Sequence, residues 1–332
     1  MTTAPVTDLR SRLSFRIPAK YVPILSTLAL LVSMFTLGAV RYPGFATGQV
    51  ILNVFIDNSF LLVVAIGMTF VILTGGIDLS VGSVVALSTL TLALLVKHGW
   101  PMLAAIVVVL VIGSTLGWAM GAVIHYFEIQ PFIVTLAGMF LARGLCYAIT
   151  VDAISITKPG YVAVAEHSFN LPGGMYVTTA VLVSVVAVVV GIYVLHYTRL
   201  GRNVYAIGGN AQSALLMGLP VGRTRIAVYT ISGFCSALGG VLLSFYMLSG
   251  SGSLAVGMEL DAIAAVVIGG TLLTGGTGYL AGTVLGVLVL GLIQTLINFQ
   301  GTLSSWWTKI AIGLLLFAFI LLQRLVLMRR KT

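Results

Sequence analysis

Charge is scarce in this sequence. Only 8% of the 332 residues are Asp, Glu, Lys or Arg, whereas a soluble domain carries about 25%. So few charges cannot cover a surface that faces water, which excludes an ordinary soluble protein. The net charge of +9 comes from 17 basic against 8 acidic residues. The basic residues lie between apolar runs, so they indicate membrane topology, and we expect no nucleic-acid partner.

Cysteines and catalytic motifs are scarce as well. The two cysteines, Cys146 and Cys235, both fall inside apolar runs, which excludes a disulfide framework or a cysteine-based metal cluster. No GxxxxGK[ST], HExxH or CxxC stretch occurs, and the four histidines are scattered. We therefore expect no phosphate-binding loop, no catalytic residues, no metal site and no cofactor bound by this chain.

Apolar residues are abundant, at 59% of the chain. Runs of about twenty recur along the whole length, and each can cross a bilayer as a helix. The sequence therefore predicts an all-α polytopic membrane protein with about ten transmembrane helices. The predicted spans are 21–40, 57–74, 79–96, 101–124, 131–150, 176–196, 226–248, 262–276, 279–299 and 306–327. The eighth is short and rich in glycine, so it either crosses fully or re-enters.

The basic residues predict the orientation of these spans. Clusters precede the first span and follow the last, and Arg199, Arg202, Arg223 and Arg225 lie between spans six and seven. The positive-inside rule then places both termini in the cytoplasm. We expect an N-terminal segment at 1–20, a membrane domain at 21–327 and a tail at 328–332. The polar outer loop 151–175 either docks a partner or is a plain connector.

One stretch of the sequence recurs two hundred residues later. "LTGGIDLSVGSVVAL" (73–87) and "LTGGTGYLAGTVLGV" (273–287) share six of fifteen positions. Transporters are often built from internal repeats with helix breaks at matching places, so we expect a parallel internal repeat. Because glycine permits sharp turns, these stretches predict a turn motif at Gly75, Gly76, Asp78, Ser80 and Gly82, matched by Gly275 and Gly276.

Asp78 is unusual because it lies within a largely apolar region. Either Asp78 or Ser80 is placed to cap the following helix by accepting hydrogen bonds from its first turn. Alternatively, Asp78 is a functional carboxylate at membrane depth, where such groups are costly. The second copy has Gly278 at the matching position. Two symmetric carboxylates are therefore excluded, which weighs against ion-coupled transport.

The loop 198–225 contains a second distinctive segment. Asn210 is a suitable N-cap, residues 211–217 can form two helical turns, and Gly218 is placed to end them. The apolar side chains of this helix would then lie outside the membrane. Such a helix suits a groove on a partner protein, or else it lies on the lipid surface; we favour the partner. Its candidate residues are Asn210, Ala211, Ser213, Leu215, Leu216, Met217 and Gly218.

Several polar residues in the spans are candidates for a solute pathway: Asn53, Asp57, Asn58, Arg143, Gln294 and Asn298. Gln294 and Asn298 are four apart and share a helix face. The alternative for these polar residues is interhelical hydrogen bonding. Arg143 lies well inside a span and must pair or reach water, and we hypothesise a pair with Asp57. Trp306 and Trp307 are expected to anchor the outer interface, and the alternative for them is stacking on the solute.

Three ordered motifs support a resemblance to a known family. "GMTFVILTGGIDLSVGS" (67–83), "YAIGGNAQSALLMGL" (205–219) and "AIAAVVIGGTLLTGGTG" (262–278) resemble signature stretches of ribose-type sugar ABC importer permeases. The resemblance runs from about residue 40 to 325. The tail "LINFQGTLSSWWTKIAIGLLLF" (296–317) is similar to the permeases of bacterial galactofuranose importers.

The resemblance implies a multi-pass permease subunit in the bacterial inner membrane, in contact with membrane lipid. It implies a second permease, homologous or identical, an ABC ATPase subunit that binds ATP and Mg, and a periplasmic sugar-binding protein. Residues 211–217 would be the helix that seats in the ATPase, called the coupling helix below. The alternative is a secondary transporter or facilitator that works alone. The structured loop 208–220 favours the importer.

Overall fold

The computed structural model describes residues 22–304 and 306–328, so the predicted N-terminal segment 1–20 and the tail from 329 onward lie outside the described residues. The chain is almost entirely helical, as predicted. The helices are α1 Val22–Arg41, α2 Gly48–Leu73, α3 Val81–Lys97, α4 Met102–Tyr126, α5 Pro131–Ile149, α6 Pro159–Ala165, α7 Thr179–Tyr197, α8 Arg199–Gly209, α9 Ala211–Leu216, α10 Val221–Met247, α11 Met258–Ile268, α12 Leu280–Gln300 and α13 Trp306–Met328.

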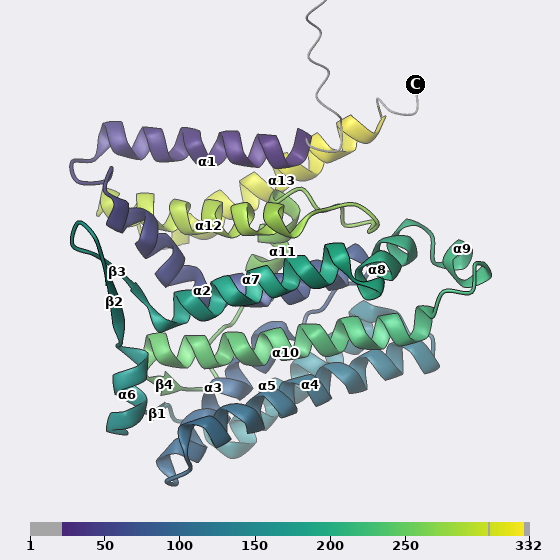
Figure 1. Cartoon of the computed structure of the whole chain (residues 1–332), viewed down its shortest axis with the longest axis horizontal. Coiled ribbons are helices and arrows are strands. Elements are labelled where there is room, and N and C mark those ends of the chain that lie inside the picture. The colour runs from purple at the N-terminus through teal and green to yellow at the C-terminus, as the bar shows by residue number, and fades with distance from the viewer. Residues whose placement is uncertain (1–21, 305, 329–332) are drawn as a thin grey trace, which may run out of the picture.

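Each of the ten predicted spans overlaps a helix of this structure, although several bounds differ. Within the described residues, seven helices are long and apolar enough to cross a membrane, namely α1, α2, α4, α5, α7, α10 and α12, and α3 and α13 add shorter apolar stretches. The long helices run side by side, with α1 at one edge of the bundle and α4 and α5 at the other (Figure 1). The all-α polytopic membrane fold is therefore confirmed.

The core of the bundle is formed by α2, α3 and α10. Every residue of α2 from Leu61 to Leu73 is buried, whereas α1, α5 and α7 expose large apolar side chains such as Leu37, Phe140 and Val189. Small residues let central helices approach closely. A Cβ added at Gly233 of α10 would overlap the backbone of Gly113 on α4. The peripheral helices thus present an apolar surface suited to lipid, whereas the core helices are covered by their neighbours.

The eighth predicted span differs from expectation. Its helix, α11, has 11 residues and is about 16 Å long, roughly half of a hydrocarbon core of about 30 Å. The helix ends at Ile268, just before Gly269 and Gly270, and Gly270 adopts φ +93°. The prediction of a helix through residue 276 is wrong, because these glycines turn the chain. Irregular backbone at membrane depth is tolerated where protein buries it.

The whole segment around α11 nevertheless passes from one end of the bundle to the other. It starts at β4, Ser249–Gly250, which pairs antiparallel with β1, Ile154–Ser155. It ends at Gly276, whose N–H donates to Leu73 O at the far end of α2 over 2.9 Å. The segment is therefore a broken crossing rather than a re-entrant hairpin.

The predicted outer loop 151–175 is ordered. It contains β1, α6 and the strand β2, Ser168–Leu171, which forms a hairpin with β3, Met175–Thr178. Tyr161 of α6 bonds Ser244 of α10 over 2.6 Å, and Lys158 Nζ donates to Trp100 O over 2.8 Å. This loop is thus fixed on the bundle, and its role in docking stays a prediction.

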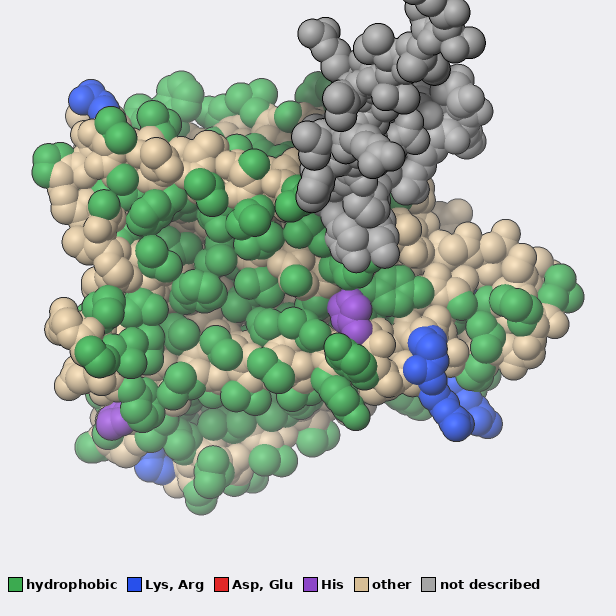
Figure 2. Space-filling view, turned by 45° about the horizontal axis from the view of Figure 1, so that its top comes forward, with side chains coloured by type: hydrophobic (Ala, Val, Ile, Leu, Met, Phe, Trp, Pro, Cys, Tyr) green, Lys and Arg blue, Asp and Glu red, His purple; other side chains and the backbone are tan. Residues whose placement is uncertain are grey.

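The short helices α8 and α9 lie at the opposite end of the bundle from this hairpin (Figure 1). Figure 2 shows a group of Lys and Arg side chains at that end, separate basic side chains at the opposite end, and hydrophobic side chains spread over the visible face. Arg199 and Arg202 of α8 are both exposed. This distribution agrees with the expected basic inner side, and which end faces the cytoplasm stays a prediction.

Candidate functional site

The two copies of the glycine motif meet at the α8 end of the bundle. Gly75 and Gly275 adopt φ +80° and +83°, which glycine tolerates without a steric penalty. The N–H of Gly276 donates to Leu73 O, as described above. A Cβ added at Gly275 would lie 2.8 Å from Gly75 N. The matched turns therefore pack directly against each other, which the sequence comparison alone could not show.

A third glycine, Gly208 of α8, completes this contact. A Cβ at Gly208 would overlap both Leu73 O and Gly276 N, whereas a Cβ at the neighbouring Gly209 would meet nothing within 4 Å. The hydroxyl of Tyr205, one turn earlier on α8, donates to Gly278 O over 2.8 Å. Burial raises the pKa of Tyr205 to about 12, so the hydroxyl is protonated and able to donate at neutral pH. Helix α8 is thus fixed to both turns.

Asp78 follows the first turn and is completely buried. Its Oδ1 accepts from Ser80 N over 2.9 Å and from Ser80 Oγ over 2.6 Å, and its Oδ2 accepts from Ser232 Oγ on α10 over 2.7 Å. The N-cap of α3 is Ser80, which makes no side-chain capping bond. The predicted cap of the first helical turn is therefore wrong: Asp78 forms an Asx turn and joins α3 to α10. Gly82, in the same motif, packs against Glu259 and Ala255 O.

The predicted helix 211–217 is present as α9, which ends one residue earlier. Asn210 is its N-cap, and the Asn210 side chain accepts from Ser213 N over 2.8 Å. Gly218 follows with φ +75°, as its predicted role as terminator requires. Ala214 is buried against the body of the protein, while Leu215, Leu216 and Met217 are 57%, 80% and 68% exposed.

Helix α9 is thus held against the body of the protein while its apolar side chains remain exposed. Capping at Asn210 and burial of Ala214 fix the helix on one side, and α8 links it to the paired turns. Exposed apolar residues on a fixed short helix suit a groove on a partner. Helix α8, which is amphipathic, was not predicted, because the expected loop 198–225 covers all of its residues.

The hypothesised pair of Arg143 and Asp57 is not formed. Arg143 Nη1 donates instead to Leu254 O, over 2.8 Å, and to Gly252 O. Asp57 Oδ1 accepts from the hydroxyl of Tyr246 over 3.3 Å. Arg143 thus satisfies carbonyls of the irregular segment between β4 and α11. No sequence signal identifies a backbone partner more than a hundred residues away.

The other pathway candidates separate into two groups. Because α2 begins nine residues before its predicted start, Asn53, Asp57 and Asn58 all lie within that helix. Asn53 accepts from Gln49 Nε2 over 2.8 Å near the outer hairpin. Asn58 and Gln294 lie together on a cavity of about 250 Å³, whereas Asn298 is exposed and does not line it.

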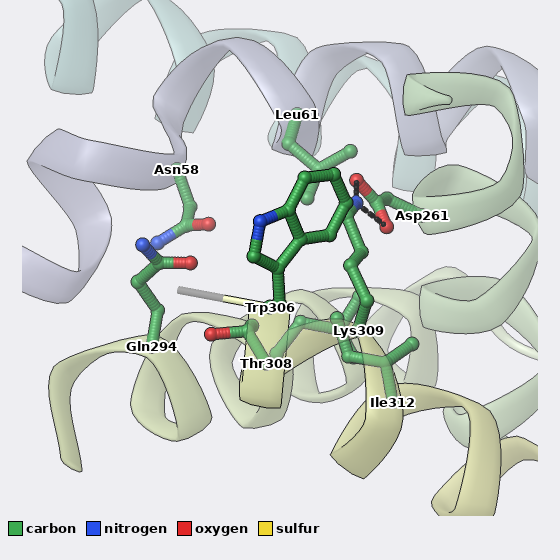
Figure 3. Close-up of a pocket in the computed structure, with 9 residues that line it drawn as sticks. Asn58, Leu61, Asp261, Gln294, Trp306, Thr308, Lys309 and Ile312 are labelled. Atoms are coloured by element: carbon green, nitrogen blue, oxygen red, sulfur yellow. Dashed lines mark hydrogen bonds and ion pairs between the residues drawn. The ribbon is translucent and has the colours of Figure 1, made fainter. Parts of the chain in front are cut away.

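Figure 3 shows this cavity, which also contains an ion pair that the sequence did not indicate. Lys309 Nζ lies 2.7 Å from Asp261 Oδ2, joining α13 to α11. Within the part of the chain that the structure describes, no group of three or more His, Cys, Asp or Glu residues is placed to hold a metal. The arrangement offers hydrogen bonding and stacking rather than covalent chemistry.

Comparison with known proteins matches this chain to membrane permeases. Residues 50–320 match the family described as branched-chain amino acid transport system / permease component. The inner membrane ABC transporter permease protein YjfF of Escherichia coli (strain K12) is 49% identical over 304 residues, which cover 91% of this chain and 92% of that protein. No solved structure matches the chain.

Two further relatives carry sugar names. The fructose import permease protein FruG of Bifidobacterium longum (strain NCC 2705) is 37% identical over 334 residues, covering 98% of each chain. The ribose import permease protein RbsC of Haemophilus influenzae is 38% identical over 281 residues, covering 84% of this chain and 86% of that protein. These alignments span the bundle, the paired turns and α9.

Proposed function

The chain belongs to the family of permease components of branched-chain amino acid and related transport systems, and from that premise we propose that it is the membrane subunit of an importer that carries a sugar across the bacterial inner membrane. ATP hydrolysis by a separate subunit drives the transport. The observation that carries this proposal is α9, an exposed apolar helix fixed at the basic end of the bundle. Such a helix suits a permease that binds a separate ATPase subunit.

The substrate class rests on the relatives. The family description names amino acids, while two of the relatives are named for fructose and ribose. The similarity of residues 296–317 to galactofuranose permeases supports galactofuranose as the sugar. The ordered outer segment around β1, α6 and the β2–β3 hairpin provides a fixed surface for a sugar-binding protein. A second permease completes the passage, and ATP and Mg bind to the ATPase.

Transport by the reconstituted complex tests this proposal. The chain is placed in lipid vesicles with its ATPase and second permease, and uptake of radiolabelled galactofuranose, ribose or leucine is followed. We expect sugar uptake only when ATP and a sugar-loaded binding protein are both present. Uptake by the chain alone, independent of nucleotide, would establish the stand-alone facilitator instead. Leucine uptake without sugar uptake would refute the sugar assignment.

A further inference from the structure

We propose that the cavity among α2, α11, α12 and α13 is a binding subsite for one neutral sugar ring on its route through the protein. This inference rests on the proposed function. The cavity has a volume of about 250 Å³ and is lined by Asn58, Leu61, Asp261, Leu290, Gln294, Trp306, Thr308, Lys309 and Ile312. Pockets for drug-sized ligands hold about 300–1,000 Å³, so this cavity suits a solute of the size of a monosaccharide.

The first supporting observation is an unpaired hydroxyl. The side chain of Thr308 is buried, with the residue 5% exposed, and its Oγ1 has no hydrogen-bond partner among the described residues. Buried polar groups are nearly always paired, and an orphan calls for an explanation. Thr308 lines the cavity beside the amides of Asn58 and Gln294 (Figure 3). Oγ1 is itself closed to solvent, so the Thr308 side chain must rotate toward the cavity, where a hydroxyl group of a ligand would be its missing partner.

The second observation concerns charge. The two charged side chains on the cavity, Asp261 and Lys309, neutralise each other, with Lys309 Nζ 2.8 Å from Asp261 Oδ1 and 2.7 Å from Oδ2. The remaining polar groups of the lining side chains are two amides, a hydroxyl and the indole N–H of Trp306, none of which is charged. To bind an amino acid zwitterion, the cavity would need one unpaired positive and one unpaired negative side chain. Asp261 and Lys309 are already paired with each other. The cavity therefore favours a neutral polyol.

The third observation is the position of Trp306. Figure 3 shows its indole between the amides of Asn58 and Gln294 on one side and the Asp261–Lys309 pair on the other. Aromatic rings offer a flat apolar face to a ligand, and Leu61, Leu290 and Ile312 add apolar lining. A sugar ring combines an apolar face of C–H groups with a rim of hydroxyls, which this lining complements.

The neighbouring Trp307 provides a matched control. It begins the same helix at the same end of the bundle but does not line the cavity. For both residues the sequence favours anchoring at the interface and leaves stacking on the solute as the alternative, and anchoring alone would make them equivalent. The structure distinguishes them.

The test is ATP-driven uptake of galactofuranose by the complete complex in vesicles, at saturating sugar-loaded binding protein, with rates normalised to inserted protein. We expect Trp306→Ala and Thr308→Val each to lower the maximal rate about threefold to tenfold, the effect of losing one or two ligand contacts. Trp307→Ala should stay within about twofold of the wild type. Thermal unfolding in detergent is measured in parallel.

Thr308→Val separates binding from folding. Valine has nearly the shape of threonine and removes an unpaired buried hydroxyl, so the melting temperature should be unchanged or higher. A lower transport rate with that stability supports the subsite. Full transport by Thr308→Val, or equal effects of Trp306→Ala and Trp307→Ala, overturns it. Those results leave the importer assignment intact, whereas absence of ATP-driven sugar uptake in the wild-type complex overturns the proposed function itself.

Discussion

At the scale of single residues, Asp78 joins two helices through three hydrogen bonds. Asp78→Ala leaves three buried donors on Ser80 and Ser232 without their acceptor, so we expect a loss of stability of about 3 kcal/mol or more. Ser232→Ala removes one of these bonds and should cost about 1 kcal/mol. Melting of the purified protein in detergent measures both. A Ser232→Ala protein that melts at the wild-type temperature would show that the carboxylate does not join α3 to α10.

Arg143 gives a second prediction at this scale. Arg143→Asp removes the donor to Gly252 O and Leu254 O, so it should destabilise the protein by about 1–3 kcal/mol. Adding Asp57→Arg should restore nothing, because Asp57 contacts Tyr246 instead. A double-mutant cycle on melting should give a coupling energy below about 0.5 kcal/mol. Rescue by the charge swap would mean that the two side chains pair after all.

Some of the site residues could be predicted from the sequence and others could not. An arginine inside a span must find partners, so a need for pairing was predictable. Its partners are main-chain carbonyls of an irregular segment, which carry no side-chain signature. Asn58 and Gln294 were predictable as pathway candidates because they are polar within apolar helices. Asp261, Lys309 and Thr308 were missed, because only the packing of α11 against α13 brings them to the same cavity.

At the scale of elements, α9 is the segment expected to bind the ATPase. Leu215→Asp with Leu216→Asp places two charges where an apolar groove would cover them, which is costly without partners. We expect copurification of the ATPase to fall about tenfold or more, with normal insertion of the permease. Val151→Asp, at the outer end and 74% exposed, is the control and should copurify normally. Unchanged assembly of the double variant would show that α9 is not the coupling helix.

The contact of α8 with the paired turns gives another element-scale prediction. Gly208→Ala forces a methyl group onto Leu73 O and Gly276 N, so the backbone must shift, and overpacking of this kind costs about 1–3 kcal/mol. Gly209→Ala adds the same methyl group next door, where nothing lies within 4 Å, and should be tolerated. Melting temperatures compare the two. A stable Gly208→Ala protein would refute the close packing of the turns.

The elements also divide into those that the sequence predicts and those that it does not. Apolar length placed each of the ten spans over part of a helix, since a helix in lipid must satisfy its own backbone. Asn210 and Gly218 correctly bounded α9 to within a residue, because caps are local chemistry. The length of α11 was not predictable, since apolar residues continue past the break at Gly269. The β2–β3 hairpin was not predicted either, because each strand has only 4 residues, which is too short for a pattern to stand out.

At the scale of the whole molecule, the predicted orientation can be measured by labelling. The natural cysteines Cys146 and Cys235 are buried and should react slowly. A cysteine at Phe169, on the outer hairpin, should react with a membrane-impermeant maleimide from outside intact cells stripped of their outer membrane. A cysteine at Leu216 should react only in inverted vesicles. The opposite pattern would reverse the assigned topology.

The meeting of Leu73, Gly208 and Gly276 has a consequence for how the molecule moves. These three residues touch through main-chain atoms, so the contact has no rotamers and cannot repack. A displacement of α9 therefore reaches both glycine turns at one point and at the same moment, through α8. The two halves of the bundle should tilt in phase, as one rigid body, rather than open one after the other.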